Sequence, residues 1–584
     1  MAATNMSTDR LDELEHEKIE DGVEKQTRRP SQKDSESSLG QDNLHINPRD
    51  QEIQWLYLEF ETELPQPSYI SNPEERRASR TQPADPPDLK DFESPFLWSA
   101  KRKSIMTWLS CIVTMFVAYN AGAYTSGLDQ MMAEWNVSRV TALVGVTVFT
   151  IGFAIAPMFL APFSEINGRR PVFVVTGLGW IVFQIVCGVT PTFAGMVVNR
   201  FLSGCASSTF STMVGGVVSD IYHAKDRNTA MTLFTAAAMT GTGLGPLVSG
   251  FIAQHTTWRW IFYLQVIIDG LLMVLIVFFF KETRGSVLLS RKAKKLNKYY
   301  DALEAAGYYG VIMNPSTTAS LTSSSEKPTS TLPQRVRWKV LADEERTSVV
   351  TMIRISLHRP FHMLFTEPVV FFFSLWISFS WAVLYMTFAA VPLIFQTTYG
   401  FNLQETGAVF SSICIASILF TVVAVKQEDW VKPHLPESQR RVFDTPEGRL
   451  WFACVESAAL PVGSIWFAVS GAYPGVHWIV PALGVSCATI GIFSIYLAVF
   501  NYLADSYHRY ASSALAAQSF CRNMLAGAFP LFTTQMFNKM TFQGAGGLLG
   551  GIGFLLTMVP WVLFLYGPKI RAKSRLASEI MTKA

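Results

Sequence analysis

Residues 199–250 read NRFLSGCASSTFSTMVGGVVSD, then IYHAKDRNT, then AMTLFTAAAMTGTGLGPLVSG, so two apolar segments flank a short charged turn. Each apolar segment exceeds the roughly 20 residues with which a helix crosses a bilayer. The first contains Arg200 within its apolar run, and the second contains several glycines and Pro246. A charge in lipid costs at least about 2.5–3.5 kcal/mol, so such residues usually line a path or meet a partner. The stretch therefore predicts membrane-spanning helices with functional residues inside them.

The composition of the whole chain agrees with this prediction. The chain has 584 residues, of which 49% are hydrophobic and 16% charged, and its mean hydropathy is +0.24 despite long polar ends. A net charge of +3 indicates no nucleic-acid partner. The cysteines all lie in apolar segments without metal-ligand spacing, so we expect packing residues, no metal and no cofactor. They are Cys111, Cys187, Cys205, Cys414, Cys454, Cys487 and Cys521.

Twelve apolar segments follow a polar tail, six on each side of a polar central stretch. Residues 1 to about 95 are too polar to bury a core, and only the patch from Trp55 to Phe60 could dock elsewhere. The predicted spans are 104–125, 140–161, 172–190, 193–219, 229–252, 258–280, 368–394, 405–425, 450–470, 475–503, 512–535 and 546–567. The fold class is an all-α membrane protein with two six-helix pseudo-repeats.

The positions of the basic residues predict the orientation. If the N-terminus is inside, the short inside connections hold seventeen Lys and Arg, and the outside ones hold three, Arg139, Arg259 and Lys539. This bias places both termini and the central loop in the cytosol. We expect a disordered cytosolic tail (1–100), a six-helix bundle (101–280), a cytosolic loop (281–367), a second six-helix bundle (368–567) and a cytosolic tail (568–584).

The central loop divides into two parts. Residues 291–310 are basic at first and have helical character, which predicts a helix along the inner membrane surface. Residues 315–333 are rich in Ser and Thr and predict a flexible linker. In the first outside loop, Asn136-Val137-Ser138 is a glycosylation sequon, although the loop is so short that a sugar would lie close to the membrane.

An internal repeat supports the division into two halves. Span 4 ends with Ser219-Asp220-Ile221-Tyr222-His223, and span 10 ends with Ala504-Asp505-Ser506-Tyr507-His508. An acid, a Tyr and a His recur in the same order at corresponding ends. Duplication about an axis along the membrane normal leaves such a pattern.

The connection between spans 2 and 3 is similar to a known signature. It reads Ala161-Pro-Phe-Ser-Glu165-Ile166-Asn-Gly168-Arg169-Arg170. This resembles the loop of the major facilitator superfamily, which has glycine, three residues, aspartate, arginine, any residue, glycine and two arginines. Glu165, Gly168, Arg169 and Arg170 match or stand for these residues, whereas Ala161 and Ile166 depart from them. The resemblance implies a charge cluster that breaks and re-forms during gating. We assign Asp220 and Asp505, the acids of the internal repeat, to the same set of gating residues.

Two further motifs resemble those of the same superfamily. Arg200 with Gly204 looks like its span 4 motif, which the family links to proton coupling; Arg200 lies roughly 10 Å from the outer end of its helix. Gly241 to Gly250, with Gly245 and Pro246, resembles the antiporter signature of span 5, which separates proton-exchanging exporters from importers. Small residues there let helices approach closely.

Four ionisable residues lie inside predicted spans: Arg200, Asp269, Glu456 and Arg522. Two acids and two arginines balance, so they could form buried ion pairs. Alternatively, one acid carries the proton, for which Glu456 is preferred over Asp269, with Arg200 setting its pKa. The pattern alone leaves both alternatives open.

The resemblance also implies which residues face the substrate, because spans 1, 4, 7 and 10 line the cavity in this superfamily. An aromatic, weakly polar wall suits bulky amphipathic or cationic solutes. The residues nominated are Asn120, Tyr124, Trp381, Tyr385, Tyr496 and Asn501, with Tyr119, Trp376 and Tyr502 beside them.

The family that the chain resembles most is the fungal drug:proton antiporters with twelve spans, including polyamine/proton antiporters. The likeness covers about residues 100–575 and includes Trp258-Arg259-Trp260 and Tyr510 to Ala517. It implies a secondary exporter that exchanges drugs, toxic metabolites or polyamines for protons by alternating access. Its partners are a small organic solute, protons and the bilayer, and we expect a monomer.

Two rivals remain. A facilitator or proton symporter would import a metabolite, and a transporter-like receptor would bind a solute without moving it. No nucleophile, metal set or phosphate loop indicates an enzyme. We expect the plasma membrane, with the vacuolar or peroxisomal membrane as alternatives.

Overall fold

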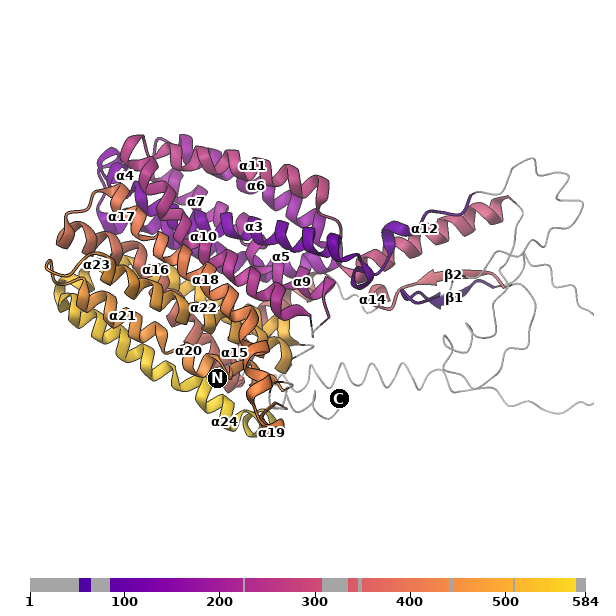
Figure 1. Ribbon diagram of the computed structural model, residues 1–584. Coiled ribbons are helices and arrows are strands. Elements are labelled where there is room, and N and C mark those ends of the chain that lie inside the picture. The colour runs from indigo at the N-terminus through magenta and orange to yellow at the C-terminus, as the bar shows by residue number, and fades with distance from the viewer. Residues whose placement is uncertain are drawn as a thin grey trace, which may run out of the picture. The chain divides into compact units, whose positions relative to one another are not determined.

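Figure 1 shows the computed structural model of the chain, which describes residues 52–62, 64, 85–223, 226–306, 334–344, 349–440, 443, 445–507 and 510–573. Helices account for most of these residues. The first 51 residues and the Ser/Thr-rich stretch 315–333 lie outside the described residues, so the expectations placed on them stay predictions.

The first half of the helix bundle contains six predicted spans. Its helices are α3 (Ala100–Ala123), η4 (Tyr124–Gly127), α4 (Leu128–Trp135), α5 (Arg139–Asn167), α6 (Arg169–Val189), α7 (Phe193–Ser207), α8 (Thr209–Thr212), α9 (Val214–Ile221), α10 (Arg227–His255) and α11 (Arg259–Phe279). The second half contains α16 (Pro368–Tyr399), α17 (Leu403–Val409), α18 (Ser411–Val431), η7 (Pro446–Leu450), α20 (Ala453–Glu456), α21 (Ala459–Ser470), α22 (Ile479–Tyr507), α23 (Ala511–Leu556) and α24 (Met558–Lys573).

The number of spans agrees with the sequence prediction. In the part of the chain that the structure describes, eleven stretches are long and apolar enough to cross a membrane. The last, Ala511–Ala572, has 62 residues, whereas one crossing needs about 20. Its backbone leaves helical geometry at Thr541, where φ is 65° and ψ is 163°. This stretch therefore counts as two spans, and the total is twelve.

The fourth span differs from the single helix predicted over 193–219. It consists of α7, α8 and α9 in succession, because side chains near the breaks bond to the backbone. The Ser208 hydroxyl donates to the Cys205 carbonyl at 2.8 Å, and the Thr212 hydroxyl donates to the Ser208 carbonyl at 2.8 Å. Bonds of this kind compete with the helical ladder and bend helices.

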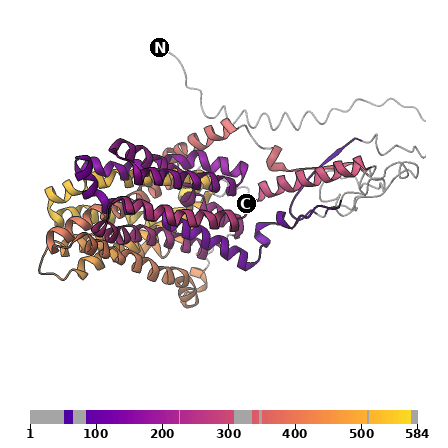
Figure 2. The same cartoon turned by 90° about the horizontal axis from the view of Figure 1, so that it is seen from above.

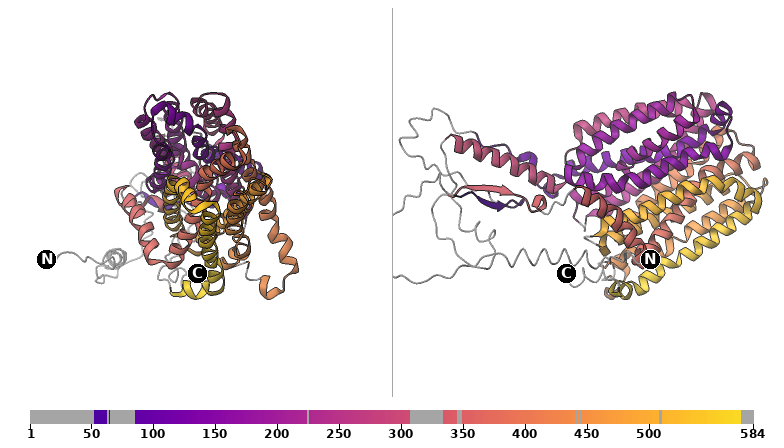
Figure 3. Two further views of the ribbon diagram at one scale, coloured as in Figure 1. Left: turned by 90° about the vertical axis from the view of Figure 1, so that its left-hand side faces the viewer. Right: turned by 180° about the vertical axis from the view of Figure 1, so that it is seen from behind.

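The two halves lie side by side and share a long interface. Figure 3 shows the indigo-to-magenta helices of the first half and the orange-to-yellow helices of the second half as two groups. Across the interface, α10 packs against α17 and α18, and α5 packs against α23. The Thr147 hydroxyl of α5 donates to the Gly527 carbonyl of α23 at 2.7 Å. The end of the bundle where α3 begins is termed the loop end, and the opposite end, which carries α4 and α17, is termed the far end.

Two strands and a helix form a small unit at the loop end (Figure 2). Strand β1 (Gln54–Tyr57) pairs in parallel with β2 (Val336–Lys339), and both lie beside α12 (Gly285–Ala305). We name this group the clasp. Its apolar core is made of Leu56, Leu58, Ala293, Leu296, Tyr300, Leu303, Val336, Trp338 and Val340.

The clasp corrects two expectations from the sequence. The tail over 1–100 is not structureless throughout, because Leu56 of β1 and Leu58 just after it are buried, while Trp55 and Tyr57 point to solvent. The central-loop helix, expected along the membrane surface over 291–310, begins at Gly285 and packs its apolar face against the strands. Each segment is too polar to bury a core of its own, and the two bury their apolar side chains in one cluster although they lie about 280 residues apart in the chain.

Polar contacts complete the clasp. Asn297 binds the backbone of Trp338 twice, accepting from its N–H and donating to its carbonyl at 2.8 Å each. Glu304 pairs with Arg335 at 2.8 Å and with Arg337 at 3.0 Å. Burial alone would raise the pKa of Glu304, but the hydrogen bond from Arg335 and the charge of Arg337 outweigh it and lower that pKa.

A further helix in the central loop was not predicted. Helix α15 (Val349–Thr366) lies against α5 of the first half and α23 of the second half, and the rings of Phe361 and Phe520 meet at 5.0 Å. Its sequence mixes charged and apolar residues, and it was therefore assigned to the polar stretch. Helix α15 adds contact between the halves near the loop end.

The clasp gives a test with a matched control. Replacing Leu56, which is 5% exposed, by Asp should place a charge in the clasp core and open it. Hydrogen–deuterium exchange of β2 and α12 should then rise by at least about tenfold, the equivalent of about 1.4 kcal/mol. Trp55→Asp changes the neighbouring residue, which is 53% exposed, and should leave exchange almost unchanged. Equal effects of both variants would contradict the clasp.

Candidate functional site

The loop end of the first half holds a charge cluster centred on Asp220. The Arg169 side chain donates from Nε to the Asp220 carboxylate at 3.2 Å, and the Arg284 Nη1 lies 3.4 Å from its other oxygen. Thr283 donates its hydroxyl to the same carboxylate at 3.3 Å. Glu165 is peripheral, 3.9 Å from Arg284. The predicted gating residues Arg169 and Asp220 are thus brought together by α6 and α9.

Glu282, which follows α11, was missed as a site residue although it organises this cluster. Its carboxylate accepts backbone N–H bonds from Arg169 at 2.8 Å, Arg170 at 3.3 Å, and Thr283 and Arg284 at 3.1 Å each. It therefore caps the first turn of α6, where a negative charge is favoured. Gly168 has φ 102° and passes so close to Glu282 that a side chain there would collide with it. The sequence feature that could have pointed to this residue is the pair Glu282-Thr283 directly after span 6.

Arg170 plays a different part from its neighbour. Its Nη2 donates to the Val277 carbonyl of α11 at 2.8 Å, which satisfies one of the last carbonyls of that helix. The signature loop therefore holds the ends of α6 and α11 together through both Arg170 and Glu282.

The second half repeats the arrangement. Arg449 donates to Asp505 at 2.9 Å, and Glu447 pairs with Arg571 at 2.6 Å. Asp505 was predicted from the acid-Tyr-His repeat, but its partner was not. The signal was present, because Gly448-Arg449 repeats the Gly168-Arg169 step of the first half.

The glycines of α10 contact both halves. A Cβ on Gly241 or Gly245 would collide with carbonyl oxygens of α3, those of Met115 and Tyr119. On the other side, Gly250 lies so close to Gly407 of α17 that a Cβ would come within 3.0 Å of its Cα. Pro246 sits between them and packs against Gly122, where a Cβ would come within 2.8 Å of the proline Cδ. The predicted antiporter motif is thus the part of α10 that lies between α3 and α17.

Arg200 lies fully buried in the first half, with 0% exposure. Its Nη1 donates to the Asn120 side-chain oxygen at 2.6 Å, and its Nε donates to the Gly145 carbonyl at 3.3 Å. The guanidinium also lies over the rings of Tyr124 and Phe149, at 4.8 and 4.4 Å. Its Nη2 has no hydrogen-bond partner. The Tyr124 hydroxyl, nominated for substrate, instead donates to the Ala142 carbonyl at 2.9 Å.

Arg522 on α23 is the buried arginine of the second half. It is 2% exposed, and its guanidinium lies over the rings of Trp381 and Tyr496 at 4.7 and 5.0 Å. Its Nε and Nη1 have no hydrogen-bond partner. Gln518, one turn earlier on α23, is also buried, and both atoms of its amide are unpartnered. Gln518 was not nominated, because the sequence does not show which polar residues of a span face inward.

Three of the nominated aromatic residues, Trp381, Tyr385 and Tyr496, form one cluster. Trp381 stacks on Tyr496 at 5.1 Å between ring centroids, Tyr496 stacks on Phe500 at 4.6 Å, and Tyr385 meets Phe388 edge-on at 5.1 Å. Phe234 of α10 contacts Tyr496 at 6.3 Å and so joins the two halves. Trp376 and Tyr502 are separate, since both pack on Phe373.

The predicted ion pairs between buried acids and arginines are not formed in the described residues. Asp269 on α11 is 1% exposed, and its Oδ2 has no hydrogen-bond partner. Tyr119 lies within electrostatic reach of Asp269, but its hydroxyl bonds to Ser249 at 3.2 Å. Among the described residues Arg200 pairs with no carboxylate, and its part in proton coupling stays a prediction. Charge balance along the sequence therefore did not predict contact in space.

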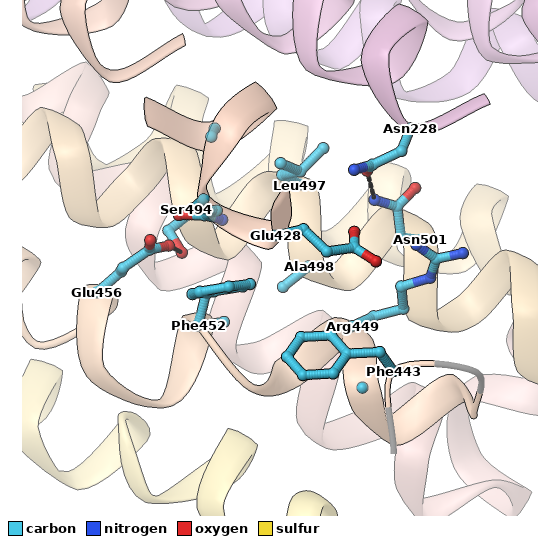
Figure 4. Close-up of a pocket in the computed structure, with 14 residues that line it drawn as sticks. Asn228, Glu428, Phe443, Arg449, Phe452, Glu456, Ser494, Leu497, Ala498 and Asn501 are labelled. Atoms are coloured by element: carbon cyan, nitrogen blue, oxygen red, sulfur yellow. Dashed lines mark hydrogen bonds between the residues drawn. The ribbon is translucent and has the colours of Figure 1, made fainter. Parts of the chain in front are cut away.

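Glu456 borders a cavity of about 50 Å³ near the loop end (Figure 4). Ser494 donates to its carboxylate at 2.5 Å. Asn228 of α10 reaches Asn501 of α22 across the cavity mouth, where their side chains bond at 3.2 Å. A cavity of this size can hold a few water molecules if polar groups line it. Asn501 thus contacts the other half and not the aromatic cluster.

The far end is also bridged. Glu134 forms a bidentate pair with Arg259 and accepts from the Trp258 ring N–H at 2.8 Å, which ties α4 to α11. Between the halves, the His255 ring bonds to the Gln404 side chain at 2.8 Å. Asn136 of the sequon is exposed at the end of α4, and Ser138 of the same sequon caps α5.

Comparisons with known proteins agree with this architecture. A family model described as the Major Facilitator Superfamily matches residues 110–531. The transporter paaT of Penicillium rubens is 31% identical over 84% of this chain and 83% of its own length. The multidrug transporter TPO1_2 of Candida glabrata is 29% identical over 83% of this chain and 78% of its own. The efflux pump FUBT of Fusarium oxysporum is 30% identical over 85% and 77%.

Solved structures show the same fold at low identity. The proton:xylose symporter XylE, bound to 6-bromo-6-deoxy-D-glucose, superposes with a TM-score of 0.54. The match covers 80% of this chain and 97% of XylE at 14% identity. The superposition supports the arrangement of the helices. Because the identity is so low, it gives no information about the solute.

The packing of α10 gives one prediction. Gly245→Ala should force α10 away from α3, because its Cβ collides with the Tyr119 carbonyl and would lie 2.9 Å from the Ala123 nitrogen. Overpacking typically costs about 1–3 kcal/mol, so for a chain of this length the melting temperature in detergent should fall by about 1–3 °C. Gly270→Ala is the control, since nothing lies within 4 Å of its Cβ. An unchanged Gly245→Ala protein would contradict the close approach.

The Glu282 cap gives a second prediction. Glu282→Ala leaves four backbone N–H groups without their acceptor and should destabilise the protein by about 1–3 kcal/mol. Glu165→Ala removes an acid of the same cluster that makes only one exposed pair at 3.9 Å, and it should cost less than about 1 kcal/mol. Thermal unfolding in one detergent compares them. A larger loss for Glu165→Ala would refute the assigned roles.

Proposed function

Because the chain belongs to the major facilitator superfamily, a family of membrane transporters and not of enzymes, we propose that it exports small organic solutes in exchange for protons. The chain is a multi-pass membrane protein, and relatives of about 30% identity are named as multidrug transporters and efflux pumps. Export and proton exchange in this chain are our proposal. So are its place in the plasma membrane with both termini cytosolic, and its monomeric state.

The observation that carries the proposal is the position of Glu456. Its carboxyl lies inside a membrane-spanning segment, borders a cavity near the interface of the halves, and has Ser494 as its hydrogen-bond donor. No cation among the described residues pairs with it. An acid in this setting can take up and release a proton without breaking an ion pair, and intramembrane acids commonly serve as proton relays.

Asp269 is the alternative carrier. Among the described residues it also lacks a cation partner, and it is more deeply buried than Glu456, but it does not line the cavity of about 50 Å³ that Glu456 borders. A proton must reach the carrier from one side of the membrane at a time, which favours Glu456. The two acids lie in different halves, on α20 and α11.

Alternating access requires contacts between the halves that open in turn. At the loop end, the Asn228–Asn501 bond and the contacts of α15 join the halves. At the far end, the His255–Gln404 bond and the approach of Gly250 to Gly407 join them. These polar and van der Waals contacts contain no ion pair, so one end can part at moderate cost while α10 remains packed on α3.

The test is solute-driven proton movement in sealed vesicles containing the purified protein. Solutes from three classes, namely polyamines, azoles and aromatic metabolites, are added while the internal pH is recorded. Antiport predicts proton movement opposite to the solute, and only for certain solutes. Solute movement without protons would favour a facilitator, movement in the same direction a symporter, and binding without movement a receptor.

A variant pair tests the carrier. Glu456→Gln should reduce solute-driven proton movement by at least about tenfold while solute binding persists, because the amide cannot carry a proton. Glu428→Gln is the control in the same cavity, since Glu428 already pairs with Lys432 at 2.5 Å. If Glu456→Gln kept full coupling and Asp269→Asn lost it, the carrier would be Asp269.

A further inference from the structure

The centre of the bundle contains more hydrogen-bond donors than the protein uses. Among the side-chain atoms of Arg200, Asn120, Arg522 and Gln518, five buried donor atoms lack a partner, and one acceptor atom does. The donors are Arg200 Nη2, Asn120 Nδ2, Arg522 Nε, Arg522 Nη1 and Gln518 Nε2, and the acceptor is Gln518 Oε1. Buried polar groups are normally satisfied, so this set requires an explanation.

The orientation of the amides does not alter the excess. Asn120 must direct its oxygen at Arg200, because a guanidinium donates and never accepts. Its nitrogen is therefore the free atom. Gln518 presents one donor and one acceptor whichever way its amide is turned. Donors therefore exceed acceptors in either orientation.

The excess also carries charge. Arg200 is 0% and Arg522 2% exposed, and no carboxylate among the described residues pairs with either. Aromatic rings face both guanidiniums, but contact with a ring face does not satisfy the N–H groups at the edge. Removing a charge from water without a counter-charge is expensive, and proteins keep such groups at sites where a ligand supplies it.

The two arginines belong to opposite halves and share one neighbouring side chain. Arg200 is on α7 and Arg522 on α23, and Tyr385 of α16 lies within electrostatic reach of both. Asn120 of α3 adjoins Arg200, and Gln518 stands one helical turn from Arg522 on the same face. A ligand between the arginines would touch both halves, as alternating access requires.

We propose that this central site binds an amphipathic organic anion, with its carboxylate between Arg200 and Arg522 and its apolar body against Trp381 and Tyr496. Planar guanidiniums suit a carboxylate, which offers acceptors only. The proposal rests on the proposed transport function and specifies its substrate class. It departs from the sequence expectation of cationic solutes such as polyamines, because an ammonium would meet two uncompensated positive charges.

The charge of the substrate has a consequence for the energetics of exchange. Outward movement of a monovalent anion with inward movement of one proton transfers two positive charge equivalents inward. An inside-negative potential would therefore drive the exchange. Exchange of a monovalent cation for one proton transfers no net charge. Dependence on membrane potential thus distinguishes the two substrate classes.

Three probes that share one phenylpropyl body test the site: 4-phenylbutyrate, 3-phenylpropanol and 3-phenylpropylamine. Equilibrium dialysis of the purified protein, with protein-free micelles as the blank, measures their dissociation constants. The acid should bind at least about tenfold more tightly than the alcohol, and the amine least, as expected for charge-assisted hydrogen bonds. Tighter or equal binding of the amine would overturn the proposal, as would no binding of the acid.

Variants then locate the binding. Arg522→Gln should weaken binding of the acid by at least about tenfold and leave binding of the alcohol nearly unchanged. Arg522→Lys should restore part of the loss. Arg440→Gln is the control, because Arg440 is exposed at the end of the short helix α19 (Glu437–Arg440) and its side chain donates to the carbonyls of Leu435 and Pro433. Unchanged binding of the acid in Arg522→Gln would place the anion elsewhere and refute the site.

The experiments distinguish a failure of the proposed anion site from a failure of the proposed proton exchange. Probes in proteoliposomes at defined membrane potentials give both results. Movement of the acid without protons would refute the exchange and retain the anion site. Exchange of the amine for protons would retain antiport and refute the anion site. The wild-type comparison of the three probes does not depend on the folding of any variant.

Discussion

The close approach of α10 to its neighbours is the constraint on which the arrangement of the two halves depends. Lipid is as apolar as a helix surface, so helices in a bilayer are held by van der Waals contact and hydrogen bonds. In α10, glycines bring the backbone against α3 on one side and α17 on the other. This packing fixes the position of α3, which carries Asn120, and of α17, which carries Gly407. Helix α10 is thus shared by both halves and can act as the element along which they move.

The central site shows how a membrane protein keeps charges in its interior. Arg200 is held by Asn120, a backbone carbonyl and two rings, and Arg522 is held by two rings, yet neither is neutralised. Two acids, Asp269 and Glu456, lie in the same bundle without pairing with them. Separating the acids from the arginines leaves the arginines available for a ligand and the acids available for a proton. A bundle of paired charges would be more stable and would have neither property.

The loop end combines duplicated and unique features. The pairs Arg169–Asp220 and Arg449–Asp505 occupy equivalent places in the two halves, as duplication predicts. The first half also has Glu282, whose carboxylate accepts hydrogen bonds at the start of α6. Three residues after Glu282 the chain enters α12 at Gly285. Through α12 the cluster is continuous with the clasp and its strand from the N-terminal tail. The signature loop is therefore joined through α12 to a unit that also contains residues 54–58.

The sequence by itself determined the number of spans, their grouping in two halves, the signature loop and the small-residue face of α10. These follow from local hydropathy and spacing, which the bilayer imposes on each segment separately. The tertiary structure alone decided that Asp269 and Glu456 do not pair with Arg200 and Arg522, that Gln518 faces the centre, and that β1 pairs with β2. Partners in space depend on how each helix is rotated and on contacts between distant residues. Hydropathy and charge counts contain no information about that rotation, since a span is equally apolar whichever way its few polar residues face.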